Sequence, residues 1–446
     1  MKRIVFIPLL LIMLLLSGLA ALAGYGYFLG DAPAGAAGFA AVDAKQLAAA
    51  DASAQVARGA YLARAGNCMG CHTPRGAPAY AGGRVLVSEF GNFITPNISS
   101  DKQTGIGAWT ADDFWGALHN GKSKDGRLLY PAFPYSNYTQ VTRLDADAMF
   151  AYFKTVPAVQ RQNQPHALHF PYNQRGLLAF WRALYFRPGE YREDTRQSVA
   201  WNRGAYLVNG LGHCSACHSS RNALGANGGS QDFSGGELAL INWYAPSLQS
   251  AQEASLARWQ PAQVQALLKT GIASHAAVSG PMAEVVAGSL QYLSDTDIAA
   301  MSQYLQALPP ASKAPGDMLD KALEGQPAGK AEMARIMTQG AALYKTHCLD
   351  CHGASGRGVA SVYPALAGNV SLQMQAFSNP VRMILAGGFP PVTNGNPRPY
   401  GMPPFGPVLN DAEVALLLSY IRNAWGNHAA LVSASEVNRY RTAPLD

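Results

Sequence analysis

Three short motifs in this chain combine the residue types that hold a redox cofactor. Each has two cysteines separated by two residues, with a histidine directly after the second cysteine. The motifs are Cys68-Met69-Gly70-Cys71-His72, Cys214-Ser215-Ala216-Cys217-His218 and Cys348-Leu349-Asp350-Cys351-His352. This spacing is the attachment signature of c-type haem, in which the cysteines form thioethers and the imidazole becomes the proximal iron ligand. The sequence therefore predicts three covalent haems and an electron carrier.

The cysteine count favours haem over the other chemistries of paired cysteines. A single motif of this kind is also compatible with a redox dithiol or with half of a zinc site. Here the three motifs use all 6 cysteines of the chain, so none remains for a disulfide. Structural zinc sites combine two such pairs, and three pairs do not divide into complete sites.

Length and composition fit a globular protein of several domains. The chain has 446 residues, which is enough for about three domains of ordinary size. Its residues are 48% hydrophobic and 14% charged, which excludes a disordered chain. The formal net charge is +6, and the propionates of three haems would contribute about −6. Nothing indicates a nucleic-acid partner, because no basic run interleaved with aromatic residues occurs.

Each motif lies inside a longer repeat, and the repeats predict the helices that position it. A helix containing a glycine opens each repeat, at residues 58–62, 203–207 and 339–343. An amphipathic helix closes each repeat, around Tyr152, Tyr304 and Tyr420. The glycine should let the aromatic residue of the last helix pack close to the backbone of the first. Such a crossed helix pair resembles the core of class I cytochrome c domains.

The segment between the motif and the last helix should supply the remaining groups around the iron. It contains Pro96, Pro246 or Pro364, whose carbonyl we expect to orient the proximal imidazole. For Pro364 an ordinary turn is equally compatible. Met282 and Met402 fall in loops before the last helices of repeats two and three, and we predict that both are distal ligands.

Three other methionines are expected to be packing residues. Met149 and Met301 occupy one aligned position inside the last helix, where repeat three has Leu417. Met383 lies on the middle helix of repeat three among apolar neighbours. Methionine often fills core space in this way.

Repeat one departs from the pattern at its distal position. The sequence there is Tyr130-Pro131-Ala132-Phe133-Pro134-Tyr135, and phenylalanine cannot ligate iron. His119 and Asn137 are possible donors, although we expect His119 to be an exposed polar residue of the middle helix. Otherwise the first haem is five-coordinate or water-bound. We predict that its spectrum differs from those of the other two and that its potential is the lowest.

The N-terminus resembles an export segment. Lys2 and Arg3 precede an apolar run over residues 4–23, which is long enough to span a bilayer. We expect an uncleaved single-span anchor in preference to a signal peptide removed after Ala21-Leu22-Ala23. Either alternative exports the rest of the chain, as attachment of c-type haem requires.

The repeats define the expected domain organisation. The first linker contains an aromatic stretch at residues 177–186, which we expect to clasp one repeat onto the next. The alternatives are a membrane surface, a quinone site or a partner interface. The expected units are a signal or anchor at 1–30, domain 1 at 51–160, a linker at 161–195, domain 2 at 196–310, a linker at 311–330, domain 3 at 331–428 and a tail at 429–446.

Segments beyond the haem motifs carry a more specific resemblance. They are 94–98, 105–107, 129–132, 170–175, 201–207, 212–214 and 280–282. With these segments the chain resembles the triple-haem cytochrome c subunit of bacterial membrane-bound alcohol, gluconate and aldehyde dehydrogenases. The resemblance implies covalent haem on Cys68, Cys71, Cys214, Cys217, Cys348 and Cys351. It also implies proximal ligation by His72, His218 and His352, and distal ligation by Met282 and Met402.

The resemblance also implies a function. We expect an all-α protein of three tandem class I cytochrome c domains, preceded by one N-terminal hydrophobic helix and located on the periplasmic face of the bacterial inner membrane. It would take electrons from a catalytic subunit holding a quinone, flavin or molybdenum cofactor and pass them to ubiquinone or a terminal oxidase. The alternative is a multihaem peroxidase or reductase that uses an open iron at the first haem.

Overall fold

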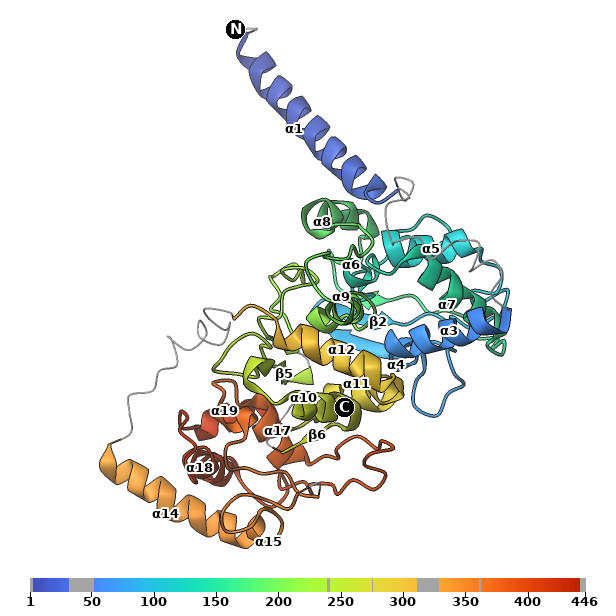
Figure 1. Ribbon diagram of the computed structural model, residues 1–446. Coiled ribbons are helices and arrows are strands. Elements are labelled where there is room, and N and C mark those ends of the chain that lie inside the picture. Colours follow the sequence, from blue (N-terminus) through green and yellow to red (C-terminus); the bar gives the residue numbers. More distant parts are fainter. Residues whose placement is uncertain are drawn as a thin grey trace.

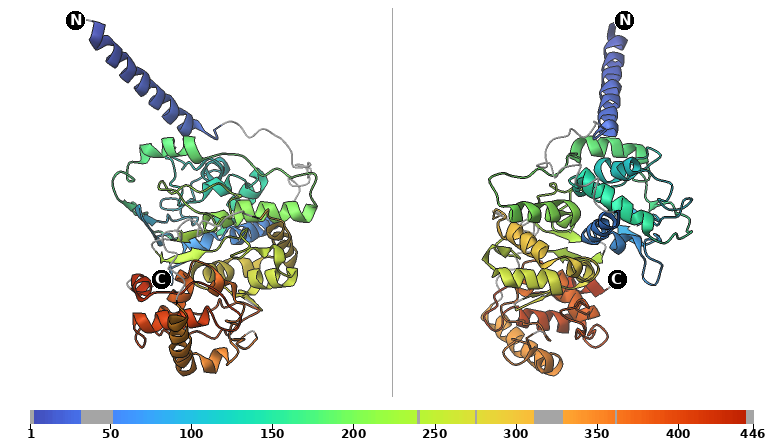
Figure 2. Two further views of the ribbon diagram at one scale, coloured as in Figure 1. Left: turned by 90° about the vertical axis from the view of Figure 1, so that its left-hand side faces the viewer. Right: turned by 45° about the vertical axis from the view of Figure 1, so that its right-hand side comes forward.

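The structure is a computed structural model, and it describes residues 3–31, 52–238, 241–274, 276–310, 329–360 and 362–441. Most of the linker expected at 311–330 lies outside the described residues. The three repeats follow one another along the molecule, and helix α1 (Arg3–Phe28) projects from the end opposite the third repeat (Figures 1 and 2).

Each repeat is built on a pair of helices that pack across each other. The pairs are α3 (Ala52–Ala65) with α7 (Arg143–Thr155), α9 (Val199–Tyr206) with α12 (Asp295–Gln306), and α14 (Lys330–His347) with α18 (Asp411–Ile421). A Cβ placed on Gly204 would overlap the carbonyl oxygen of Ala300, and Gly59 and Gly340 are in equivalent positions. The predicted close approach of the two helices at this glycine is confirmed.

A shorter middle helix completes each repeat. These helices are α5 (Ala111–Asn120), α10 (Pro261–Thr270) and α17 (Ser378–Ala386). Helix α5 begins with a capping box formed by Thr110 and Asp113, and α10 begins with a proline, which has no backbone N–H to leave unpaired. The cores confirm the packing role of Met149 and Met301, which are 1% and 2% exposed.

The expectation of an all-α protein is wrong, because three small antiparallel sheets occur. The first has the order β1 (Val85–Ser88), β2 (Gly91–Ile94) and β3 (Ala167–Leu168). The others pair β4 (Gly236–Leu238) with β5 (Trp243–Ala245), and β6 (Ile272–Ala273) with β7 (Ala276–Ala277). Their strands have two to four residues, too few for the alternating pattern by which a strand is predicted.

The expectation of an N-terminal membrane-spanning helix is not supported. Within the described residues, no helix has the length and apolar character needed to cross a membrane. The last turns of α1 pack against helix α8 (Leu178–Tyr185) of the first linker. The fully buried Arg182 of α8 donates to the carbonyl oxygens of Gly26 and Leu29, at 2.9 and 2.7 Å. This part of α1 is therefore committed to contacts within the protein.

The first linker acts as a clasp between the first two repeats. Its strand β3 pairs with β2 of the first repeat. Trp181 of α8 packs on Tyr135 of the first repeat, and its indole N–H donates to the carbonyl of Leu224 in the second, at 3.0 Å. The clasp interpretation is therefore confirmed for Trp181.

The two largest clusters of buried residues are one continuous core across repeats one and two and a separate core in repeat three, and a small third cluster joins the first repeat to helix α8. The third repeat is seated on the second through Asn379, whose side-chain amide pairs with the backbone N–H and C=O of Tyr244, each at 2.8 Å. Beside it, Arg382 lies over the ring of Trp243 at 5.1 Å. The C-terminal tail adds helix α19 (Ala434–Arg441), which packs on α18.

Candidate haem attachment sites

Each Cys-X-X-Cys-His motif lies shortly after the first helix of its repeat, and in repeat two the π-helical segment η2 (Leu207–Leu211) continues that helix. In repeats one and two a residue in the left-handed region, Asn67 (φ 47°) or His213 (φ 38°), stands immediately before the first cysteine. Helix α4 (Cys68–His72) and the 3-10 turn η3 (Cys214–Ala216) then carry the motif. In repeat three, α14 continues to His347, and α15 (Leu349–His352) follows Cys348. The two cysteines and the histidine are thus held on one short turn.

Each of the three motif histidines makes an equivalent hydrogen bond to a proline carbonyl. The Nδ1 atom of His72 lies 2.7 Å from the carbonyl oxygen of Pro96, that of His218 lies 2.8 Å from Pro246, and that of His352 lies 3.0 Å from Pro364. A carbonyl at this distance accepts the Nδ1 proton, which leaves Nε2 as the free donor to a metal. The expected role of the proline carbonyl is confirmed in all three repeats, including Pro364.

Burial keeps these side chains in the protonation state that the chemistry needs. It lowers the pKa of all three motif imidazoles below the ordinary value, although the bond to the proline carbonyl opposes the shift. The histidines are therefore neutral at pH 7, which is the form that ligates a metal. Burial also raises the pKa of the Cys68 and Cys214 thiols to about 12 and that of Cys348 to about 11.

The residues present fit a porphyrin better than a metal ion held by protein alone. All 6 cysteines are free. Among the described residues, no group of three or more His, Cys, Asp or Glu is arranged to hold a metal ion. Each neutral histidine thus stands as a single metal donor beside two thiols. That donor set suits a cofactor that supplies its own equatorial nitrogens and is anchored through sulfur.

The two predicted distal methionines lie in the cores that contain their attachment cysteines. Met282 and Cys214 pack against the shared core of repeats one and two, whereas Met402 and Cys348 belong to the core of repeat three. Met402 lies in a loop, where its backbone pairs with Gly388. Met282 is not in a loop as predicted, because helix α11 (Gly280–Gly288) begins two residues before it. Ligation by the two methionines stays a prediction.

Both candidate donors of repeat one make hydrogen bonds within the protein, and ligation of iron by either residue stays untested. His119 is buried, not exposed as expected, and its ring stacks on Trp115 with centroids 4.4 Å apart. Its Nδ1 lies 2.8 Å from the carbonyl oxygen of Thr139. The side-chain amide of Asn137 donates to Asn209 and Ser215 of the second repeat, at 2.8 and 2.9 Å. Both side chains serve packing and domain contact.

Comparison with known proteins decides the family. The family model of cytochrome c matches residues 56–157, 202–309 and 337–425, which contain the three motifs. The chain belongs to the cytochrome c family. These three cytochrome c domains carry three c-type haems, and their role is electron transfer.

Relatives that match over most of their length show which kind of cytochrome c protein the chain resembles. The chain is 37% identical over 400 residues to the cytochrome c subunit of alcohol dehydrogenase (quinone) from Gluconobacter oxydans, covering 87% of this chain and 82% of the relative. It is 35% identical over 408 residues to the gluconate 2-dehydrogenase cytochrome c subunit of Pantoea cypripedii, covering 87% and 90%. The fructose dehydrogenase cytochrome subunit of Gluconobacter japonicus matches at 35% over 405 residues, covering 86% and 82%. The resemblance to dehydrogenase cytochrome subunits is confirmed.

One set of site residues was not found from the sequence. Arg58, Tyr61 and Asp145 of the first cytochrome c domain meet Arg203, Tyr206 and Asp297 of the second in a polar cluster between the domains. A signal was present, because an arginine and a tyrosine flank the helix glycine in repeats one and two. Gln339 and Ala342 replace them in repeat three.

Proposed function

We propose that this chain is the electron-transfer subunit of a dehydrogenase complex on the periplasmic face of a bacterial inner membrane. A catalytic subunit with a quinone, flavin or molybdenum cofactor would reduce it, and ubiquinone or a terminal oxidase would accept its electrons. The observation that carries this proposal is the similarity to dehydrogenase cytochrome subunits over 86–87% of the chain, together with three equivalent proximal sites.

The division of labour follows from the chemistry of the sites. A bound haem supplies reversible one-electron chemistry at its iron. The chain orients each proximal histidine through a proline carbonyl that lies 2.7–3.0 Å from its Nδ1. It also packs the first cysteine of each motif against an apolar core. Such groups set the potential and the spacing of carriers. Substrate oxidation would then belong to the partner subunit.

The proposal is tested in the source bacterium by deleting the gene and restoring it in two forms. One form is the wild-type chain, and the other is the double variant Cys348→Ala/Cys351→Ala, which removes the third haem attachment. Membranes are assayed for alcohol, gluconate and aldehyde oxidation, first with a dye acceptor and then with oxygen. We expect the dye-linked activity to persist in all strains and oxygen uptake to return only with the wild type. Unchanged oxygen uptake in the deletion strain for every substrate would refute the proposal.

A second candidate function is peroxide reduction at the first haem. It is favoured by one observation: the sequence of repeat one has phenylalanine at the position of the distal methionine. Peroxide-dependent oxidation of a reduced carrier by the purified chain alone would support this candidate. Absence of such turnover would refute this candidate.

A further inference from the structure

Domains 1 and 2 each contain the same ion pair, in which the aspartate is buried and the arginine is partly exposed. Arg58 of α3 binds Asp145 of α7, with its Nε 2.8 Å from Oδ1. Arg203 of α9 binds Asp297 of α12 with two hydrogen bonds of 2.8 Å. Each arginine precedes the glycine of its first helix, and each aspartate is the third residue of its last helix. The two pairs are therefore equivalent members of the repeat.

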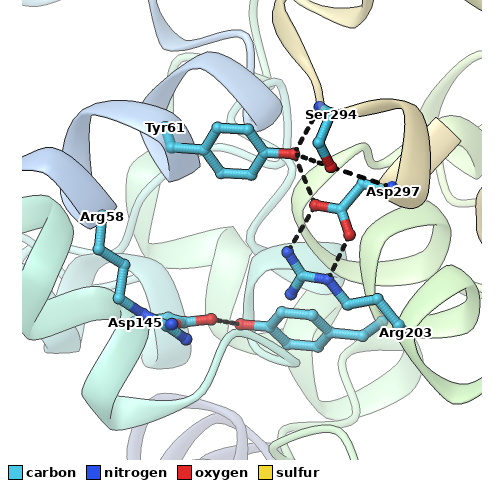
Figure 3. Close-up of polar contacts among 7 residues, drawn as sticks. Arg58, Tyr61, Asp145, Arg203, Ser294 and Asp297 are labelled. Atoms are coloured by element: carbon cyan, nitrogen blue, oxygen red, sulfur yellow. Dashed lines mark hydrogen bonds and ion pairs between the residues drawn. The ribbon is translucent and has the colours of Figure 1, made fainter. Parts of the chain in front are cut away.

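Each aspartate also accepts a hydrogen bond from the other domain. The Tyr206 hydroxyl of domain 2 donates to Asp145 at 2.6 Å, and the Tyr61 hydroxyl of domain 1 donates to Asp297 at 2.6 Å (Figure 3). Both tyrosines are two residues after the helix glycine. Because equivalent residues exchange equivalent bonds, domains 1 and 2 are related by an approximate two-fold axis, as in an isologous dimer.

The third domain lacks this arrangement. Gln339 and Ala342 stand where the arginine and the tyrosine would be. The third residue of its last helix is Glu413, which closes a capping box with Asn410 at 2.9 and 3.0 Å. The exchange is thus specific to domains 1 and 2, which also share one core.

The two-fold contact brings the distal segment of each domain against the haem attachment segment of the other. From domain 1, helix α6 (Tyr135–Tyr138) directs Asn137 onto Ser215, which lies between the cysteines of the second motif, at 2.9 Å. From domain 2, α11 packs on α4, and Glu284 pairs with Arg84 at 2.8 Å. The first and second attachment motifs therefore lie on either side of one interface.

The buried carboxylates make this geometry strongly preferred. The side chain of Asp145 is 3% exposed and that of Asp297 is 10% exposed. A carboxylate buried to this degree depends on its donors, since an unpaired buried charge is costly. Burial raises the pKa of Tyr206 well above its ordinary value, and the negative charge of Asp145 raises it further. The hydroxyl therefore remains a donor at neutral pH. Separation of the domains would leave each aspartate without its tyrosine.

We propose that Tyr61 and Tyr206 are positioning residues for direct electron exchange between the first and second haems. The proposal rests on the electron-transfer role of the chain and is independent of the identity of its partner. The step moves one electron from a ferrous haem to a ferric haem, and it forms and breaks no bond. The two reciprocal hydrogen bonds hold the attachment segments at one separation, so the exchange takes place at a single rate.

The test compares Tyr61→Phe, Tyr206→Phe and the double variant in the full-length chain with all three haems attached. Tyr344→Phe is the matched control, because its hydroxyl donates to the Gly353 carbonyl at 2.7 Å within domain 3. Electron exchange is followed after a rapid pulse of reductant, and magnetic coupling between haems one and two by electron paramagnetic resonance. Loss of a hydrogen bond to a charged group raises the population of separated domains about tenfold.

We expect a slower exchange phase and weaker coupling in each single variant, a larger effect in the double variant, and wild-type behaviour in the control. A merely structural role would lower the unfolding midpoint without changing either measurement in the folded protein. Wild-type exchange and coupling in all three variants would overturn the proposal. If the double variant does not accumulate with haem, the single variants decide, since each keeps one of the two reciprocal bonds. Absence of a dehydrogenase partner would refute the proposed function and leave this inference intact.

Discussion

Replacement of Gly204 by alanine tests the packing on which each domain is built. Gly204 lies where α9 crosses α12, and an added Cβ would overlap the carbonyl oxygen of Ala300 and press on the Cβ of Tyr304. Neither neighbouring atom can move by side-chain rotation, because one is backbone and the other is the first side-chain carbon. The helices must therefore separate to accept the methyl group.

The expected magnitude is the difference between two opposing effects. Alanine favours a helix over glycine by about 1 kcal/mol. Overpacking of a filled core costs about 1–3 kcal/mol, and contact with fixed backbone atoms places this site at the upper end. We expect Gly204→Ala to lower the free energy of unfolding by about 2 kcal/mol, the difference between these two figures.

The assay is denaturant unfolding of the purified chain with its haems attached, followed by circular dichroism. Gly176→Ala is the control, because nothing lies within 4 Å of the position that its Cβ would take. Its unfolding midpoint should stay at or slightly above that of the wild type. A Gly204→Ala midpoint equal to or above the wild-type value would show that the crossing helices tolerate the methyl group, and the reasoning would be wrong.

Three further predictions concern the iron ligands, the domain contact and the first linker. Met282→Ala and Met402→Ala should each remove about half of the methionine–iron charge-transfer band, which should integrate to two haems in the wild type; a band equivalent to three haems would show that the first haem has methionine too. Burial opposes ionisation of Asp297, but hydrogen bonds from its arginine and tyrosine partners outweigh it and lower the pKa. The stability from this carboxylate is therefore present above about pH 4 and is lost as the pH falls through the lowered folded-state value. Unfolding midpoints measured from neutral to acid pH should fall less steeply for Asp297→Asn than for the wild type, and equal slopes would contradict the assignment. Arg182→Met leaves the carbonyls of Gly26 and Leu29 without their donor, so it should lower the free energy of unfolding by about 3 kcal/mol. It should also speed cleavage by chymotrypsin near residue 28. The control Arg187→Met, on the same segment, should change neither the free energy of unfolding nor the cleavage rate.

The sequence predicted the parts of the site that depend on local spacing. The helix glycine, the attachment motif and the proline segment recur in the same order in each repeat, so one repeat explains the others. The proline carbonyls behind His72, His218 and His352 are therefore where the repeat suggested. The N-terminal boundary of α11 was missed because Gly280-Pro281 is as typical of a turn as of a helix start.

The parts that were not predicted depend on contacts between distant segments. Strand β3 has two residues and exists because it pairs with β2, about seventy-five positions earlier in the chain, and such a pairing leaves no periodic pattern. His119 was expected on the surface because a lone polar residue on a helix usually lies there. Instead its side chain is buried, where it stacks on the ring of Trp115 and hydrogen-bonds to a backbone carbonyl. In both cases tertiary packing outweighed the local preference.

The chain divides into a fixed pair and an added third domain, and this division follows from where its polar groups are buried. Reciprocal hydrogen bonds to Asp145 and Asp297 hold domains 1 and 2 together at an interface within a single core. Haems one and two therefore cannot move apart without exposing apolar surface and leaving two buried carboxylates without a donor. Domain 3 keeps its own core and meets domain 2 through contacts that include the Asn379 amide. The separation of the first two haems is therefore set by the fold of the pair, whereas the position of the third relative to them depends on a smaller set of contacts.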